Sequence, residues 1–103
     1  DNPMTPSTKE ALKKEIVQRL KAEKEIKKIV IFGSFLDSEQ PNDVDVAIFQ
    51  DSQETYLNLA LKYRKLIRNV IRQIPVDVIP VKENISEGSF LAEIEAGELI
   101  YER

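Results

Sequence analysis

The sequence contains no cysteine and no histidine. Without cysteine there can be no disulfide, thiolate metal site or thiol nucleophile. Without histidine the chain lacks the commonest zinc ligand, the usual general base and every Ser-His triad. Chemistry therefore has to come from carboxylates, hydroxyls, lysines, tyrosines or backbone amides. Carboxylates on their own prefer hard cations, so any bound metal is expected to be Mg²⁺ or Mn²⁺.

Long apolar runs are missing as well. No stretch approaches the roughly 20 apolar residues of a membrane span, and the N-terminus shows no signal-peptide core. We therefore expect a cytoplasmic protein without a membrane partner. The 103 residues, 42% hydrophobic and 32% charged, provide for one buried core. We expect a single domain over residues 1–103.

Basic residues are absent from a long central stretch, between Lys28 and Lys62. Six acidic residues fall inside it: Asp37, Glu39, Asp43, Asp45, Asp51 and Glu54. Carboxylates without a nearby cation repel one another unless a metal or a spatial neighbour neutralises them; a solvated acidic loop is the other interpretation. The net charge of −3 and the lack of a basic patch interleaved with aromatics disfavour nucleic acid as a ligand.

Hydrophobic periodicity predicts an α/β (α+β) domain in the order helix–strand–strand–helix–strand–helix. The predicted elements are a helix over 7–25 capped by Ser7 and Glu10, strands at 29–32 and 43–49, a helix from the cap 51–54 to Pro75, a strand at 76–79 stopped by Pro80, a helix from Ser86 to a C′ residue at Gly97, and an optional closing strand at 99–101. The second helix should bury Leu57, Ala60, Leu61, Ile67, Ile71 and Ile74.

The connection from Phe32 to Asp43 is too short for a crossover helix. The first two strands should therefore pair antiparallel. The third strand follows a long helix and can lie parallel to the second. The sheet is expected to be small and mixed, packed with helices.

Three features at the predicted strand ends bear on chemistry. Gly33-Ser34 ends a buried strand, where glycine permits a sharp turn and close approach to an anion; a plain turn is the ordinary alternative. Asp43-x-Asp45 places two carboxylates on one strand face, about 7 Å apart at Cα, at a spacing suited to Mg²⁺. Incidental aspartates on an exposed face are the alternative. Asp77 is either an edge charge against aggregation or a third ligand or base.

Taken together, Ile31-Phe32-Gly33-Ser34-Phe35 and Asn42-Asp43-Val44-Asp45-Val46 resemble the Gly-Ser…Asp-x-Asp signature of the DNA polymerase β-like nucleotidyltransferase superfamily. Asp77 falls where that superfamily has its third acid. The short chain resembles the minimal nucleotidyltransferases (MNT), often encoded beside a HEPN-domain protein as a toxin–antitoxin pair. The sequence departs from the pattern after Ser34: the connection to Asp43 is shorter than usual, and Asp37 stands where a basic residue is common.

The resemblance implies transfer of a nucleotide, AMP from ATP by default, to a hydroxyl on a partner protein. It implies that Asp43, Asp45 and Asp77 bind Mg²⁺ or Mn²⁺, that Gly33 and Ser34 hold the distal phosphates, and that Asp77 also acts on the acceptor hydroxyl. A HEPN-type partner, or a second copy of the chain, would complete the acceptor site. The alternative is a weak or inactive nucleotidyltransferase-like module that neutralises its partner by contact, which the altered loop after Ser34 favours.

Overall fold

A mixed four-stranded β-sheet forms the centre of the molecule. The computed structural model describes residues 4–85 and 89–103, and its strands are β1 (Ile26–Phe32), β2 (Val44–Gln50), β3 (Val76–Lys82) and β4 (Glu98–Glu102). Their order across the sheet is β3-β2-β1-β4. β1 pairs antiparallel with both β2 and β4, whereas β2 and β3 run parallel. These pairings confirm the predicted mixed sheet, and the optional closing strand exists as β4.

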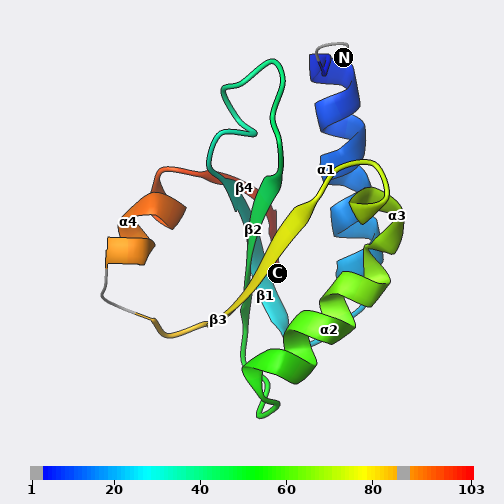
Figure 1. The fold of residues 1–103 in the computed structure, drawn as a ribbon. Coiled ribbons are helices and arrows are strands. Elements are labelled where there is room, and N and C mark those ends of the chain that lie inside the picture. Colours follow the sequence, from blue (N-terminus) through cyan, green and yellow to red (C-terminus); the bar gives the residue numbers. More distant parts are fainter. Residues whose placement is uncertain (1–3, 86–88) are drawn as a thin grey trace.

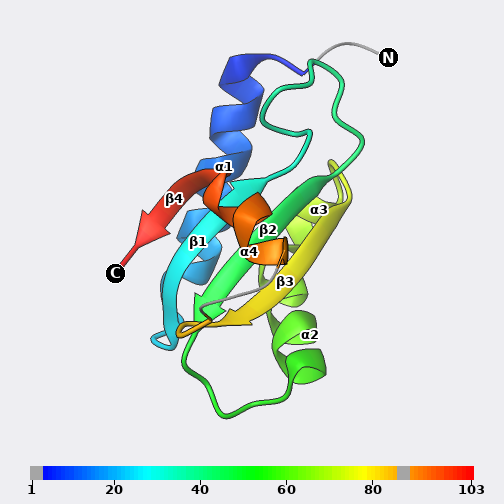
Figure 2. The same ribbon diagram turned by 90° about the vertical axis from the view of Figure 1, so that its left-hand side faces the viewer.

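Helices cover the two faces of the sheet unequally. The helices are α1 (Pro6–Leu20), α2 (Tyr56–Leu66), α3 (Arg68–Ile71) and α4 (Ser89–Glu95). In Figure 1, α1, α2 and α3 lie on one side of the sheet and α4 lies on the other. Figure 2 shows α4 in front of the sheet, over β1 and β2. The short α4 therefore covers only part of the sheet face on which it lies.

The core is divided by the sheet into two layers. Val44, Val46 and Ile48 of β2 belong to the large buried cluster under α1–α3. Ala47 and Phe49 belong to a smaller cluster on the α4 side, together with Ile94 of α4. This alternation is the period of two expected for a strand. It confirms that the valines and Ile48 occupy the face opposite Asp45.

α1 differs from the prediction at both ends. Pro6 is the first helical residue, so the cap has to precede it. Thr5 is that cap, and its side chain accepts a hydrogen bond from the Thr8 amide at 3.1 Å. The predicted cap at Ser7 is wrong. The helix ends at Leu20, before the predicted 25, because β1 already begins at Ile26, which is fully buried.

The buried face of α2 also differs from the prediction. Leu57 and Leu61 are 64% and 57% exposed, whereas Leu59 and Tyr63 are buried. Ile67, Val70 and Ile74 continue the buried face. Both sets of residues recur at helical spacing, so periodicity alone does not choose between them. The cap is Thr55, whose side chain accepts from the Asn58 amide, and not a residue of 51–54; Ile67 interrupts the helix.

Pro80 departs from its predicted role, and Gly97 occupies its predicted position for a different reason. β3 continues through Pro80 to Lys82, because β3 is an edge strand and proline is tolerated where one row of N–H groups has no partner strand. Gly97 lies at the predicted C′ position, the second residue after α4, but it does not have the positive φ that is usual there. A Cβ there would collide with the Ile31 carbonyl oxygen of β1, so this glycine permits close packing of the chain onto β1. The predicted helix start at Ser86 lies outside the described residues.

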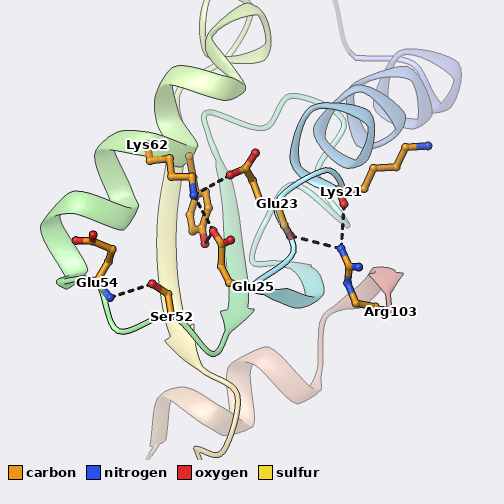
Figure 3. A network of polar contacts seen from close by, with 8 residues as sticks. Lys21, Glu23, Glu25, Ser52, Glu54, Lys62 and Arg103 are labelled. Atoms are coloured by element: carbon orange, nitrogen blue, oxygen red, sulfur yellow. Dashed lines mark hydrogen bonds and ion pairs between the residues drawn. The ribbon is translucent and has the colours of Figure 1, made fainter.

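A polar network ties the α1–β1 connection to α2 (Figure 3). The Lys62 Nζ lies 2.7 Å from Glu23 and 3.0 Å from Glu25, and the Tyr63 hydroxyl donates to Glu25 at 2.8 Å. Burial opposes ionisation of Glu25, but the hydrogen bonds from Lys62 and Tyr63 outweigh it and lower its pKa. Within the described part of the chain, no helix is long and apolar enough to cross a membrane.

Candidate active site

Three carboxylates meet at the end of the sheet where β1 finishes and β2 and β3 begin. Asp45 pairs in register with Asp77 on the neighbouring parallel strand and with Phe32 on β1. Asp43 immediately precedes β2. One oxygen from each of the three aspartates lies within 4.8 Å of the others. The structure therefore brings together all three acids that the sequence predicts.

Gly33 places the loop after β1 directly against this cluster. Its φ of 85° lies in the left-handed region that side chains rarely adopt. A Cβ on Gly33 would also run into the Asp45 carboxylate. The residues that follow form a hydrogen-bonded turn in which Ser38 N donates to Ser34 O at 2.8 Å. We call Gly33–Ser38 the glycine loop; it forms a single hydrogen-bonded turn.

A cleft of about 460 Å³ opens beside Asp45 and the glycine loop. Its lining residues are Phe32, Gly33, Ser34, Leu36, Asp37, Asp45, Glu93 and Ala96. Glu93 and Ala96 come from α4 and the residues just after it and were not predicted. Their positions depend on how α4 packs onto the sheet through Ile94. The sequence pattern of α4 alone does not reveal this packing. Asp37, the departure from the superfamily pattern, also faces this cleft.

The cleft concentrates negative charge around Asp45. Burial raises the pKa of the Asp45 carboxyl to about 6; a hydrogen bond with Asp77 and the charges of Asp43, Asp77 and Glu93 act in the same direction. Ionising Asp45 in this place is unfavourable without a neutralising cation. The site is thus destabilised by its own charge and suited to an added positive ion.

The unfavourable ionisation of Asp45 predicts that the stability of the protein depends on pH in metal-free buffer. Between pH 3.8 and about 6 the folded protein holds a proton on Asp45 that the unfolded chain has released. Stability should therefore fall as the pH rises through this window. We expect Asp45→Asn to raise the free energy of unfolding by about 1–2 kcal/mol at pH 7, allowing for solvent screening.

Urea unfolding in EDTA at pH 4 and pH 7 measures this effect. At pH 4 the variant and the unaltered protein should differ little. Asp51→Asn, which removes an exposed carboxylate at the opposite end of the sheet, is the control and should give no such gain. A gain of equal size at both pH values would contradict the charge explanation.

The donor set fits a hard divalent cation. All three candidate ligands are carboxylates with oxygens near enough to share one ion or a close pair of ions, and Mg²⁺ and Mn²⁺ favour oxygen ligands. Asp43 and Asp45 are half-buried, whereas Asp77 is exposed. Two of the ligands are thus held by packing, and the third faces solvent, where a second substrate can approach.

Comparison with known families agrees with this geometry. The family described as "Polymerase beta, Nucleotidyltransferase" matches residues 14–103, which include every residue of the site. The chain belongs to this family. It is therefore a nucleotidyltransferase domain, and the resemblance noted in the sequence is confirmed. A search of the curated proteins finds no match.

Solved structures of similar fold include two toxin–antitoxin complexes. One is a complex of a tri-AMPylated Shewanella oneidensis HEPN toxin with an MNT antitoxin; its matched chain shares 17% identity with a TM-score of 0.60, over 92% of this chain and 73% of that chain. The other is the toxin–antitoxin MntA-HepT, at 16% identity and a TM-score of 0.57, over 91% and 73% of the two chains. At these identities the likeness establishes a shared fold.

Proposed function

We propose that this nucleotidyltransferase domain transfers AMP from ATP to a hydroxyl on a HEPN-type protein partner and acts as the antitoxin of a toxin–antitoxin pair. The observation that carries the proposal is the triad of Asp43, Asp45 and Asp77, with ligand oxygens within 4.8 Å, set against the glycine loop in a member of this family. A similar fold occurs in a complex whose HEPN toxin is tri-AMPylated, which supports AMP as the group and a HEPN protein as the acceptor.

In the proposed reaction, the acceptor hydroxyl oxygen attacks the α-phosphorus of ATP. A bond forms between that oxygen and phosphorus, the bond from the α-phosphorus to the β-bridging oxygen breaks, and pyrophosphate leaves. When bound, Mg²⁺ or Mn²⁺ would supply positive charge for the triphosphate and lower the pKa of the acceptor hydroxyl. Asp43, Asp45 and Asp77 would hold the cation. Gly33 and Ser34 hold the distal phosphates with backbone and hydroxyl groups.

Asp77 takes the proton in this scheme. Its carboxylate is exposed at the start of β3 beside Asp45, so an acceptor hydroxyl can reach it from solvent. A general base has to lie within hydrogen-bond reach of the proton that it removes. Glu93 and Asp37 border the same cleft and restrict it to a substrate that arrives with its charge neutralised by the cation. The cytoplasmic location stays a prediction.

Asp77→Asn should leave partner binding nearly unchanged and reduce AMP transfer by about a hundredfold or more, the usual contribution of a positioned base. The measurement is the intact mass of a HEPN-type protein after incubation with Mg²⁺-ATP and either variant. The unaltered protein should add one or more AMP groups. Asp51→Asn serves as the matched control, since it removes an aspartate charge far from the cleft, and should transfer normally.

The second candidate function is neutralisation of the partner by contact alone. It is favoured by the face opposite the cleft, where α2 exposes Tyr56, Leu57 and Leu61 at 59%, 64% and 57%. Lys65 and Arg68 border a hollow of about 740 Å³ on the same side. Exposed apolar side chains with cations beside them suit an acidic protein surface. If the partner gains no mass yet is still neutralised, transfer is wrong and this contact function is correct.

A further inference from the structure

A lysine of α1, Lys9, binds two backbone carbonyls of the glycine loop. The Lys9 Nζ donates to the carbonyl oxygens of Phe35 at 2.5 Å and of Ser38 at 2.6 Å. It also lies 5.2 Å from the centroid of the buried Phe35 ring. Close by, the Met4 amide donates to the Glu39 carbonyl at 2.7 Å. The start of α1 is thus fastened to the glycine loop and the residue after it.

These contacts fall at one end of a polar turn. The amides of Leu36, Asp37 and Ser38 donate backward to the carbonyls of Gly33 and Ser34, so the dipoles of the turn are aligned, as in the first turn of a helix. The positive Lys9 ammonium lies at the carbonyl end, where cations are favoured. Charge-assisted hydrogen bonds of this kind are stronger than neutral ones. Lys9 therefore stabilises the turn from the side away from the cleft.

The loop contains no cation of its own to do this. No basic residue occurs between Lys28 and Lys62, and Asp37 within the loop borders the cleft. The Asp37 carboxylate repels a triphosphate, so the loop backbone has to be held in place by other contacts. The sequence thus leaves the loop without a cation, and the fold supplies one from α1, 26 positions away from Phe35.

We propose that Lys9 is a positioning residue that holds the glycine loop in the shape that receives the distal phosphates. The inference rests on the proposed nucleotidyl transfer and adds a residue outside the known motif. Lys9 does not touch the nucleotide; it acts through the carbonyls of Phe35 and Ser38. Metal binding at Asp43, Asp45 and Asp77 does not depend on it, because those side chains come from β2, β3 and the residue just before β2.

Three variants test the role of Lys9. Lys9→Met keeps the aliphatic stem over Phe35 and removes the ammonium, and Lys9→Arg restores a cation. Lys13→Met is the matched control one turn along α1, because the Lys13 ammonium pairs with Glu10 and Glu98 and not with the loop. For each protein we would measure the Kd of a non-hydrolysable ATP analogue with Mg²⁺, the Kd of Mn²⁺ alone, and the melting temperature.

Lys9→Met should weaken binding of the analogue about tenfold, the loss of a charge-assisted contact, while the Mn²⁺ Kd stays unchanged. Lys9→Arg should recover most of the analogue affinity. Lys13→Met should bind the analogue normally even if its melting temperature falls. Normal analogue binding by Lys9→Met, or an equal loss of analogue and Mn²⁺ binding, would overturn the positioning role.

Failure of the proposed function is distinguishable from failure of this inference. If the unaltered protein binds Mn²⁺ but no ATP analogue, nucleotide transfer is wrong and the positioning role falls with it. If the unaltered protein binds the analogue, amide hydrogen exchange at Leu36, Asp37 and Ser38 gives a second readout. Faster exchange at these amides in Lys9→Met than in Lys13→Met supports the inference. Equal exchange in the two variants contradicts it.

Discussion

Replacing Asp43 and Asp45 together by asparagine is expected to abolish the stabilisation that Mg²⁺ or Mn²⁺ gives to the unaltered protein. An ion that binds only the folded state at a hundredfold excess over its Kd adds about 2.7 kcal/mol. For a domain of this size that is a rise in melting temperature of about 12 °C. The double variant loses two of the three clustered carboxylates, so its melting temperature should not respond to either metal. Nucleotidyl transfer should fall below detection.

The matched control is the double variant Asp51→Asn with Glu54→Gln. It removes an equal number of negative charges from exposed positions after the C-terminal end of β2, so it separates site binding from a general effect of net charge. The control should keep the full metal response when both proteins are followed by thermal melting with and without MnCl₂. A metal response that persists in the Asp43/Asp45 variant would show that the ion binds elsewhere.

Gly33→Val should damage nucleotide binding more than any other single change in the glycine loop. The φ of 85° is costly for a β-branched residue, and the new Cβ would meet the Asp45 carboxylate. The loop has to move away from the acids to accommodate it. We expect the affinity for a non-hydrolysable ATP analogue with Mg²⁺ to fall about a hundredfold, the combined effect of a displaced backbone and a displaced ligand.

Two further variants make this result interpretable. Gly33→Ala introduces the same Cβ with less backbone strain, and should lose affinity in the same direction if Gly33→Val is too unstable to assay. Ser38→Ala changes the same loop at a residue that does not line the cleft and removes only a hydrogen bond from the Gln40 amide. Its analogue affinity should stay close to that of the unaltered protein. Equal affinities for all three variants would exclude Gly33 from the phosphate site.

Some errors of the sequence interpretation have a common physical origin. The α2 pattern offers two apolar faces, and the face with Leu59 and Tyr63 is the one that packs into the large buried cluster under the sheet. Proline ends a strand when its missing N–H is needed for pairing with a neighbouring strand. β3 is an edge strand with a neighbour on one side only, so Pro80 is tolerated within it. In both cases the outcome depends on which element lies next to the residue. That information is not contained in the local segment.

The sequence by itself predicted the family resemblance, the antiparallel pairing of the first two strands and the three acidic residues, because each depends on order and spacing along the chain. For the third strand it allowed a parallel pairing without requiring one. Asp45 and Asp77 meet because β2 and β3 run parallel and in register, a register that the sequence did not predict. Only the tertiary structure decided that Glu93 borders the cleft and that Lys9 holds the glycine loop. Both residues lie far from the motif in sequence, and their positions follow from how α4 and α1 pack on opposite faces of the sheet. Packing of whole helices against a sheet depends on many weak contacts summed over the fold, and no short pattern records that sum.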